Sequence, residues 1–349
     1  MKKALVVLLV LACVGAAAFA DDMAAPTAKW SAATWYGWAY AMPNSGAIVE
    51  QYDYSWVGAG AFRLGFSYTS SDGNAGFNAR FTNTAPLNAS MAVNVDRLNG
   101  WAKMFGGMLT VRAGLLDDYT IATADWNNFG KTDNKLGMYF DVSPVAGLDV
   151  GAFLPFPATS DAAANIFAPA GGAYAVVGAS YAVPNLVTVV AGGDASNAVY
   201  FGANVKAVPN LTAILEAKIS LASGNAMTFE ENVGYAMGPL TVGARIGEVN
   251  DSNASTAFSW GIEPTVAYKV TDAIALNLII NAFNNPSQTW MSPIDAKAIL
   301  PQGNVGDTNF GGGAFVTLTQ SGFVLTAGGY YSAVTNAGAL LFVNGDLSL

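Results

Sequence analysis

The sequence predicts an all-β fold, a transmembrane antiparallel β-barrel of 16–18 strands, from three observations. Large apolar residues recur at every second position, as in AFRLGFSYT at 61–69, where Phe62, Leu64 and Phe66 alternate with Arg63 and Gly65. Such segments of about ten residues, separated by turn residues, are the signature of membrane barrels. The chain is 52% hydrophobic and only 11% charged, against about 25% charged in soluble proteins. Much of its surface is therefore expected to face lipid.

The N-terminus has the order of a secretory signal peptide. Two lysines precede an apolar run, and Ala18-Phe19-Ala20 precedes Asp21. This is an A-x-A-like cleavage site. We expect residues 1–20 to direct export through the Sec pathway and to be cleaved, and residues 21–349 to form a single barrel in the bacterial outer membrane. A lipoprotein signal at Val10-Leu11-Ala12-Cys13 is the weaker alternative.

Charge and residue usage exclude several classes of function. Removing Lys2 and Lys3 takes the 15 basic and 24 acidic residues to 13 and 24, a net charge of −11. Nucleic acid is excluded as a partner, because phosphate binding needs a basic face. The chain has no histidine, and its single cysteine leaves with the signal peptide. Imidazole triads, thiol catalysis and most zinc sites are excluded. We expect no enzyme, no catalytic residue, no cofactor and no metal.

A membrane-spanning helix is the first alternative to a barrel. Residues 168–193 carry no charge and are long enough to cross a bilayer. Gly171-Gly172, Pro184-Asn185 and Gly192-Gly193 interrupt this stretch. Two strands around a Pro-Asn turn fit it better.

The expected strands follow the alternating rows along the chain. Clear rows cover residues 62–69, 77–82, 109–115, 211–221, 258–269, 274–281 and 339–349. A last strand that runs to the end of the chain suits barrel closure, which removes both sheet edges.

Three segments fit this pattern badly. The row through Phe229 and Val233 places Glu231 on the lipid side, which costs up to about 2–4 kcal/mol near the midplane. We expect Glu231 near a rim, at a subunit contact or beside a bulge. Pro264 requires a bulge or a missing ladder bond. Residues 88–105 lose their alternation around Asp96.

Connections between the strands have two lengths. Short turns stand at Ser71-Asp72-Gly73, Val183-Pro184-Asn185 and Val208-Pro209-Asn210, among others, whereas the longest connections cover about 42–56, 117–135, 156–171 and 285–308. Short periplasmic turns and longer extracellular loops are typical of outer-membrane barrels.

Charged residues on the polar rows are the candidate site. Arg63, Arg80 and Arg112 occupy the polar rows of the second, third and fifth expected strands, and Asp117, Asp118 and Asp125 follow the fifth strand in a long connection. The polar rows also place Glu216, Lys218, Arg245 and Glu263 on the lumen side.

At this point the chain resembles the bacterial general porins. NGWAKMFGGMLTVRAGLL at 99–116 is similar to the hairpin that precedes their third loop. In that family the loop folds into the barrel, and its acidic groups face wall arginines. The resemblance implies a constriction loop at 116–135 and selectivity set by Arg63, Arg80, Arg112, Asp117, Asp118 and Asp125. The loop lacks the PEFGG-type sequence of enterobacterial members. The signal and the small-residue-rich strands are also similar to spirochaete outer-membrane proteins.

The function expected is that of an outer-membrane porin, a water-filled channel for passive diffusion of small hydrophilic solutes and ions. Its partners would be outer-membrane lipid and these solutes. The resemblance to general porins also implies two further copies of the chain in a homotrimer. A sugar- or nucleoside-selective channel is one alternative, suggested by Tyr139, Tyr200 and Tyr330 on polar rows. A structural or adhesive surface barrel is the other. Tryptophans near strand ends, including Trp101, are assigned to interface girdles.

Overall fold

One closed sheet makes up the described part of the protein. The computed structural model describes residues 26–42, 62–83, 93–116, 135–156, 175–221, 226–250, 258–284, 308–332 and 338–348. Within these ranges there are eighteen strands, all in one antiparallel sheet. They are β1 (Thr27–Met42), β2 (Phe62–Thr69), β3 (Ala75–Asn83), β4 (Val93–Met104), β5 (Leu109–Leu115), β6 (Leu136–Val145), β7 (Leu148–Pro155), β8 (Val176–Val183), β9 (Val187–Asp194), β10 (Ala198–Val205), β11 (Leu211–Ser220), β12 (Met227–Met237), β13 (Leu240–Asn250), β14 (Phe258–Lys269), β15 (Ile274–Phe283), β16 (Asn309–Gln320), β17 (Phe323–Ser332) and β18 (Gly338–Ser348).

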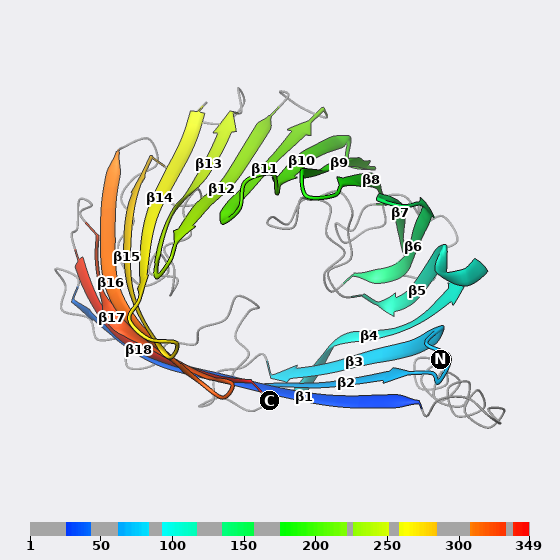
Figure 1. The fold of residues 1–349 in the computed structure, drawn as a ribbon, viewed down its shortest axis with the longest axis horizontal. Helices are drawn as coiled ribbons and strands as arrows, with labels where there is room; N and C mark the ends of the chain where they lie inside the picture. Colours follow the sequence, from blue (N-terminus) through cyan, green and yellow to red (C-terminus); the bar gives the residue numbers. More distant parts are fainter. Residues whose placement is uncertain are drawn as a thin grey trace.

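The order of the strands closes the sheet into a barrel. Neighbours follow chain order from β1 to β18, and β1 pairs with β18 as well as with β2. Figure 1 shows the strands around a ring, with the first and last side by side. Closure leaves no free edge in this ring. The predicted antiparallel barrel of 16–18 strands is confirmed, with eighteen strands in the described part of the chain.

The two ends of the barrel carry different connections. Each even-numbered strand from β2 to β16 joins the next strand by a short turn, which between β4 and β5 contains the 3-10 turn Phe105–Gly107. Asn185 and Asn210, in the two Val-Pro-Asn turns, have φ of 57° and 64°, which asparagine tolerates better than most residues. The predicted long connections lie largely outside the described residues.

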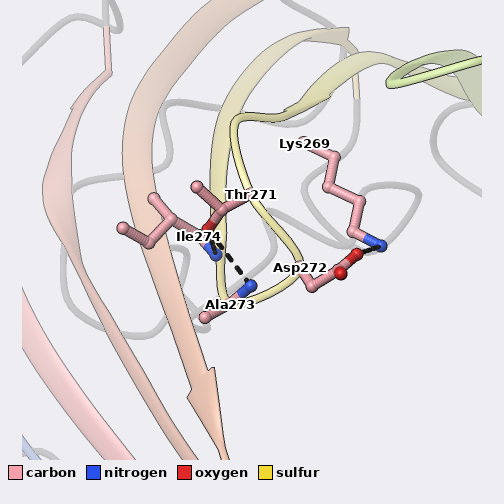
Figure 2. A network of polar contacts seen from close by, with 5 residues as sticks. All are labelled: Lys269, Thr271, Asp272, Ala273 and Ile274. Carbon is pink, nitrogen blue, oxygen red and sulfur yellow. Dashed lines mark hydrogen bonds and ion pairs between the residues drawn. The ribbon is translucent and has the colours of Figure 1, made fainter.

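Side chains satisfy polar groups within the short turns. In the β14–β15 turn, Lys269 Nζ lies 2.7 Å from Asp272 Oδ1, and the backbone N–H groups of Ala273 and Ile274 donate to Thr271 Oγ1 (Figure 2). The hydrogen bond and the charge of Lys269 lower the pKa of Asp272 below its usual value. In the β2–β3 turn, hydrogen bonds from Ser70 and Asn74 lower the pKa of Asp72.

Alternation along each strand separates an outward face from an inward face. On β15, Leu276 and Leu278 are 47% and 45% exposed, whereas Ile279 is 4% and Asn281 0% exposed. Cross-strand partners lie on the same face of a sheet, so the pairing of the strands tells which residues face inward and which face outward around the whole ring. The outward rows are apolar and the inward rows hold most polar side chains, which suits a wall between lipid and water. Among the described residues, no helix has the length and apolar character needed to cross a membrane.

Two irregularities match the segments that fitted the pattern badly. The β3–β4 ladder shifts register between Arg80 and Phe81, so β4 contains a bulge where alternation was lost. The β14–β15 ladder skips Glu263 and Pro264, with the same register on both sides. Because proline has no N–H to donate, the expected missing ladder bond at Pro264 is confirmed.

Candidate functional site

One side of the inner wall is basic. Its inward rows carry one arginine on each of β2, β3, β4 and β5, namely Arg63, Arg80, Arg97 and Arg112. We call these four residues the arginine arc. Arg80 stands directly opposite Arg97, and all four side chains are partly exposed. Like charges directly opposite one another destabilise a sheet. This wall is therefore built at some cost in stability.

Arg97 is a site residue that sequence reasoning missed. With strict alternation, the Arg97 side chain would face outward like that of Val95, which is two residues before it and 44% exposed. In the structure Phe81 pairs with Val95 while Arg80 pairs with Arg97, so Asp96 is the extra residue of the bulge. The bulge turns Arg97 to the face of Arg80. The loss of alternation around Asp96 was the signal that could have found it.

Trp101 also belongs to the inner wall. It pairs with Gly76 and Arg112, both on inward rows. A Cβ built on Gly76 would lie 2.6 Å from the Trp101 ring, so the ring rests on bare backbone. Lys103 Nζ lies 5.6 Å from the ring centroid, within the range of a cation–π contact. The assignment of Trp101 to an interface girdle is wrong, because girdle residues point outward.

The opposite side of the wall carries carboxylates. They are Glu216 on β11, Glu230 on β12 and Glu263 on β14, which we call the carboxylate arc. Glu216 stands directly opposite Glu230. Glu263 stands opposite Arg245, with Arg245 Nη1 3.8 Å from Glu263 Oε1. Glu216 and Glu263 are 3% and 0% exposed, whereas Glu230 is partly exposed. Glu230 is therefore the carboxylate that reaches solvent best.

The two like-charge pairs face each other across the barrel. β3 and β4 lie eight positions from β11 and β12 in the eighteen-stranded order, close to half of the ring (Figure 1). Arg80 is the sixth residue of β3 and Glu216 the sixth of β11, and both strands begin at the end with tight turns. The Arg80–Arg97 and Glu216–Glu230 pairs thus lie at a comparable depth.

The three inward tyrosines are packed into the wall of the barrel. Tyr139, Tyr200 and Tyr330 are 5%, 2% and 5% exposed. Tyr330 Oη donates to Asn281 Oδ1 at 2.5 Å, and Tyr200 Oη donates to Asp194. A Cβ built on Gly311 would collide with Tyr330, and one built on Gly313 would lie 3.0 Å from its ring, so this ring lies against the adjacent strand. The three rings offer little free surface on which a sugar could stack.

The other predicted site residues divide into two groups. Lys218 and Arg245 lie on inward rows, and Lys218 Nζ is 5.9 Å from the Tyr200 ring centroid. Asp117, Asp118 and Asp125 lie outside the described residues, so the constriction loop stays a prediction. Within the described ranges, no group of three or more histidine, cysteine, aspartate or glutamate residues could hold a metal ion.

Comparisons with known proteins identify the fold. No family model matches the sequence, and no curated protein is similar to it. The structure is similar to that of Pseudomonas aeruginosa OccK1 (OpdK), with a TM-score of 0.59 and 13% sequence identity over 93% of this chain and 98% of that one. It is also similar to P. aeruginosa OccK3 (OpdO), with a TM-score of 0.57 and 11% sequence identity over 93% of this chain and 95% of that one. A third similar structure is that of the P. aeruginosa outer membrane protein OprD, with a TM-score of 0.56 and 10% sequence identity over 94% of this chain and 95% of that one.

The chain therefore has the fold of an outer-membrane β-barrel porin. At such low identity, the likeness establishes the fold alone. The spirochaete likeness gains no support, because these structures come from Pseudomonas aeruginosa.

Proposed function

We propose that this chain is an outer-membrane porin, a water-filled channel for the passive diffusion of small hydrophilic solutes and ions. The observation that carries the proposal is the pair of like-charge contacts, Arg80–Arg97 and Glu216–Glu230, at a comparable depth on opposite sides of one barrel. Barrels of sixteen to eighteen strands leave an aqueous channel, whereas eight strands are filled by side chains. Water in such a channel screens the partly exposed Arg80, Arg97 and Glu230, which a dry interior would not tolerate beside like charges.

Charge on the two walls would act on solutes in transit. The arginine arc attracts anionic groups and the exposed part of the carboxylate arc attracts cationic groups, so polar solutes align across the lumen. Pore width then sets the size limit. Inward folding of loop 116–135, with Asp117, Asp118 and Asp125 opposite the arginines, remains part of the proposal as the narrowest point.

Planar-bilayer conductance tests the proposal directly. The refolded chain 21–349 is compared with a variant in which Arg63, Arg80, Arg97 and Arg112 are alanine. We expect open channels from both, with the reversal potential of the variant shifted toward cation preference. Lys206→Ala with Lys269→Ala is the control, since these exposed lysines lie in or beside the short turns. A well-folded barrel without conductance would refute the porin and leave the structural or adhesive surface protein.

A substrate-selective channel is the second candidate. One of the similar structures is of OpdK with vanillate, an aromatic carboxylate, and an arginine row suits carboxylates. Sugar or nucleoside selectivity has less support, because the inward tyrosine rings are almost fully buried. Liposome swelling separates the candidates: uptake graded by solute size indicates a general porin, and uptake confined to one solute class indicates a selective channel. The homotrimer and the contact with outer-membrane lipid stay predictions.

A further inference from the structure

The outward face of the barrel is apolar almost throughout, with one local exception. Among outward residues whose direction the ladders fix, only Glu231 on β12 and Glu248 on β13 are acidic or basic. Glu231 pairs with Ile246, and Glu248 pairs with Phe229 two residues away. The two residues are therefore diagonal neighbours, whose Cα atoms lie about 7–8 Å apart by usual sheet geometry. Both charged groups on the lipid side thus belong to one patch.

The position of Glu231 removes two of the three explanations expected from the sequence. It is the fifth of the eleven residues of β12, so it is not at a rim. The β11–β12 and β12–β13 ladders run through it without a register shift, so it is not beside a bulge. No described residue donates a hydrogen bond or a positive charge to either carboxylate. A contact with another molecule is the explanation that remains.

The surroundings of Glu231 suit close packing against protein. Its direct outward partners, Leu215 and Ile246, are large, but three of its diagonal neighbours are small: Ala213 and Ala217 on β11 and Ala244 on β13. β15 differs, because its outward row is Ile274, Leu276, Leu278 and Ile280. Small residues allow close approach of membrane-embedded segments, and polar side chains then hold them together.

We propose that the outward face around Glu231 and Glu248, with Ala213, Ala217 and Ala244, binds a membrane-embedded polypeptide that presents a lysine or arginine to the two carboxylates. Acyl chains offer neither charge nor hydrogen bonds. A second copy of this chain packed wall to wall fits poorly, since the ladder-fixed outward rows contain no lysine or arginine. Charge complementarity therefore selects a different protein. The proposal does not depend on the channel conducting.

Site-specific photo-crosslinking in cells of the source bacterium tests this surface. A benzophenone amino acid replaces Leu215 or Ile246, the two cross-strand partners of Glu231, or Leu278 on β15 as the control. Leu215 and Leu278 are similarly exposed, at 42% and 45%. We expect one polypeptide other than this chain to be captured at 215 and 246 but not at 278, through a peptide that contains lysine or arginine.

Carboxylate variants decide whether the contact depends on charge. Glu231→Gln with Glu248→Gln should reduce the crosslink about tenfold, while Asp272→Asn, in an exposed turn, should leave it unchanged. If the double variant does not assemble, the two single variants carry the test. Adducts only with lipid or a second copy, a captured peptide without a basic residue, or an undiminished yield in the glutamine variants would each overturn the proposal.

Discussion

The arginine arc and the carboxylate arc lie on opposite sides of one barrel but handle charge differently. The arginines of β2–β5 are all partly exposed, and Lys103 adds a further positive charge on the same face. In the carboxylate arc, Glu263 is buried against Arg245, and Lys218 follows Glu216 on the same row. The basic wall therefore acts on solutes through several exposed groups, and the acidic wall mainly through Glu230.

Reversing the basic pair should have the largest effect. Arg80→Glu with Arg97→Glu would make both walls acidic at one depth. We expect the cation-to-anion permeability ratio to rise at least about tenfold, since the two reversals change the wall by four unit charges and each charge within contact distance is worth about 1 kcal/mol in water. Reversal potentials in a salt gradient measure this ratio. The shift should shrink near 1 M salt, where the Debye length falls to about 3 Å. A shift that does not depend on salt would contradict an electrostatic cause.

Neutralising the acidic pair should have the opposite and smaller effect. Glu216→Gln with Glu230→Gln should favour anions by about two- to threefold, less than one tenfold step of 1.4 kcal/mol, because Glu216 is buried and only Glu230 reaches solvent well. The same reversal-potential measurement applies. Glu230→Gln alone should give most of the change, and an equal change from Glu216→Gln alone would show that burial does not weaken its influence.

The repulsion between Arg80 and Arg97 should lower the free energy of unfolding of the barrel. Arg97→Gln removes the repulsion with Arg80 and should stabilise the barrel by about 0.2–1 kcal/mol. Arg63 stands opposite Ala33 and Thr82 instead, so Arg63→Gln should bring no such gain. Urea unfolding midpoints of the two variants in lipid vesicles give the comparison. Equal midpoints would mean that water in the lumen already screens the Arg80–Arg97 pair.

The smallest expected effect is on the carboxylates of two short turns, Asp72 between β2 and β3 and Asp272 between β14 and β15. The pKa of Asp72 is lowered by hydrogen bonds from Ser70 and Asn74, and that of Asp272 by Lys269. Because both folded pKa values lie below the unfolded value, each carboxylate stabilises the fold above that unfolded value, and the contribution is lost as the pH falls through the folded one. Lys269→Ala should raise the pKa of Asp272 and leave Asp72 unchanged. Carboxyl chemical shifts in a pH titration measure both, and a matching rise at Asp72 would contradict local control.

Much of the barrel could be predicted from the sequence because a strand has a period of two. The rows around Arg63, Arg80 and Arg112 fix which residues share a face, and the alternation around Glu216 and Glu263 does the same on the far side. Arg97 could not be found in this way, because one bulged residue reverses every direction that follows it. Trp101 was misassigned for a related reason: a position near a strand end does not tell inside from outside.

By itself, the sequence determined the strand rhythm, the apolar outward rows and the identity of the charges, since these follow from local backbone geometry and composition. Only the tertiary structure decided the number of strands that close the ring, the register that sets Arg80 against Arg97 and Glu216 against Glu230, and the placement of these pairs on opposite sides. It also decided that Glu231 and Glu248 are neighbours on the outward face. Register and closure depend on hydrogen bonds between distant segments, which no local pattern specifies.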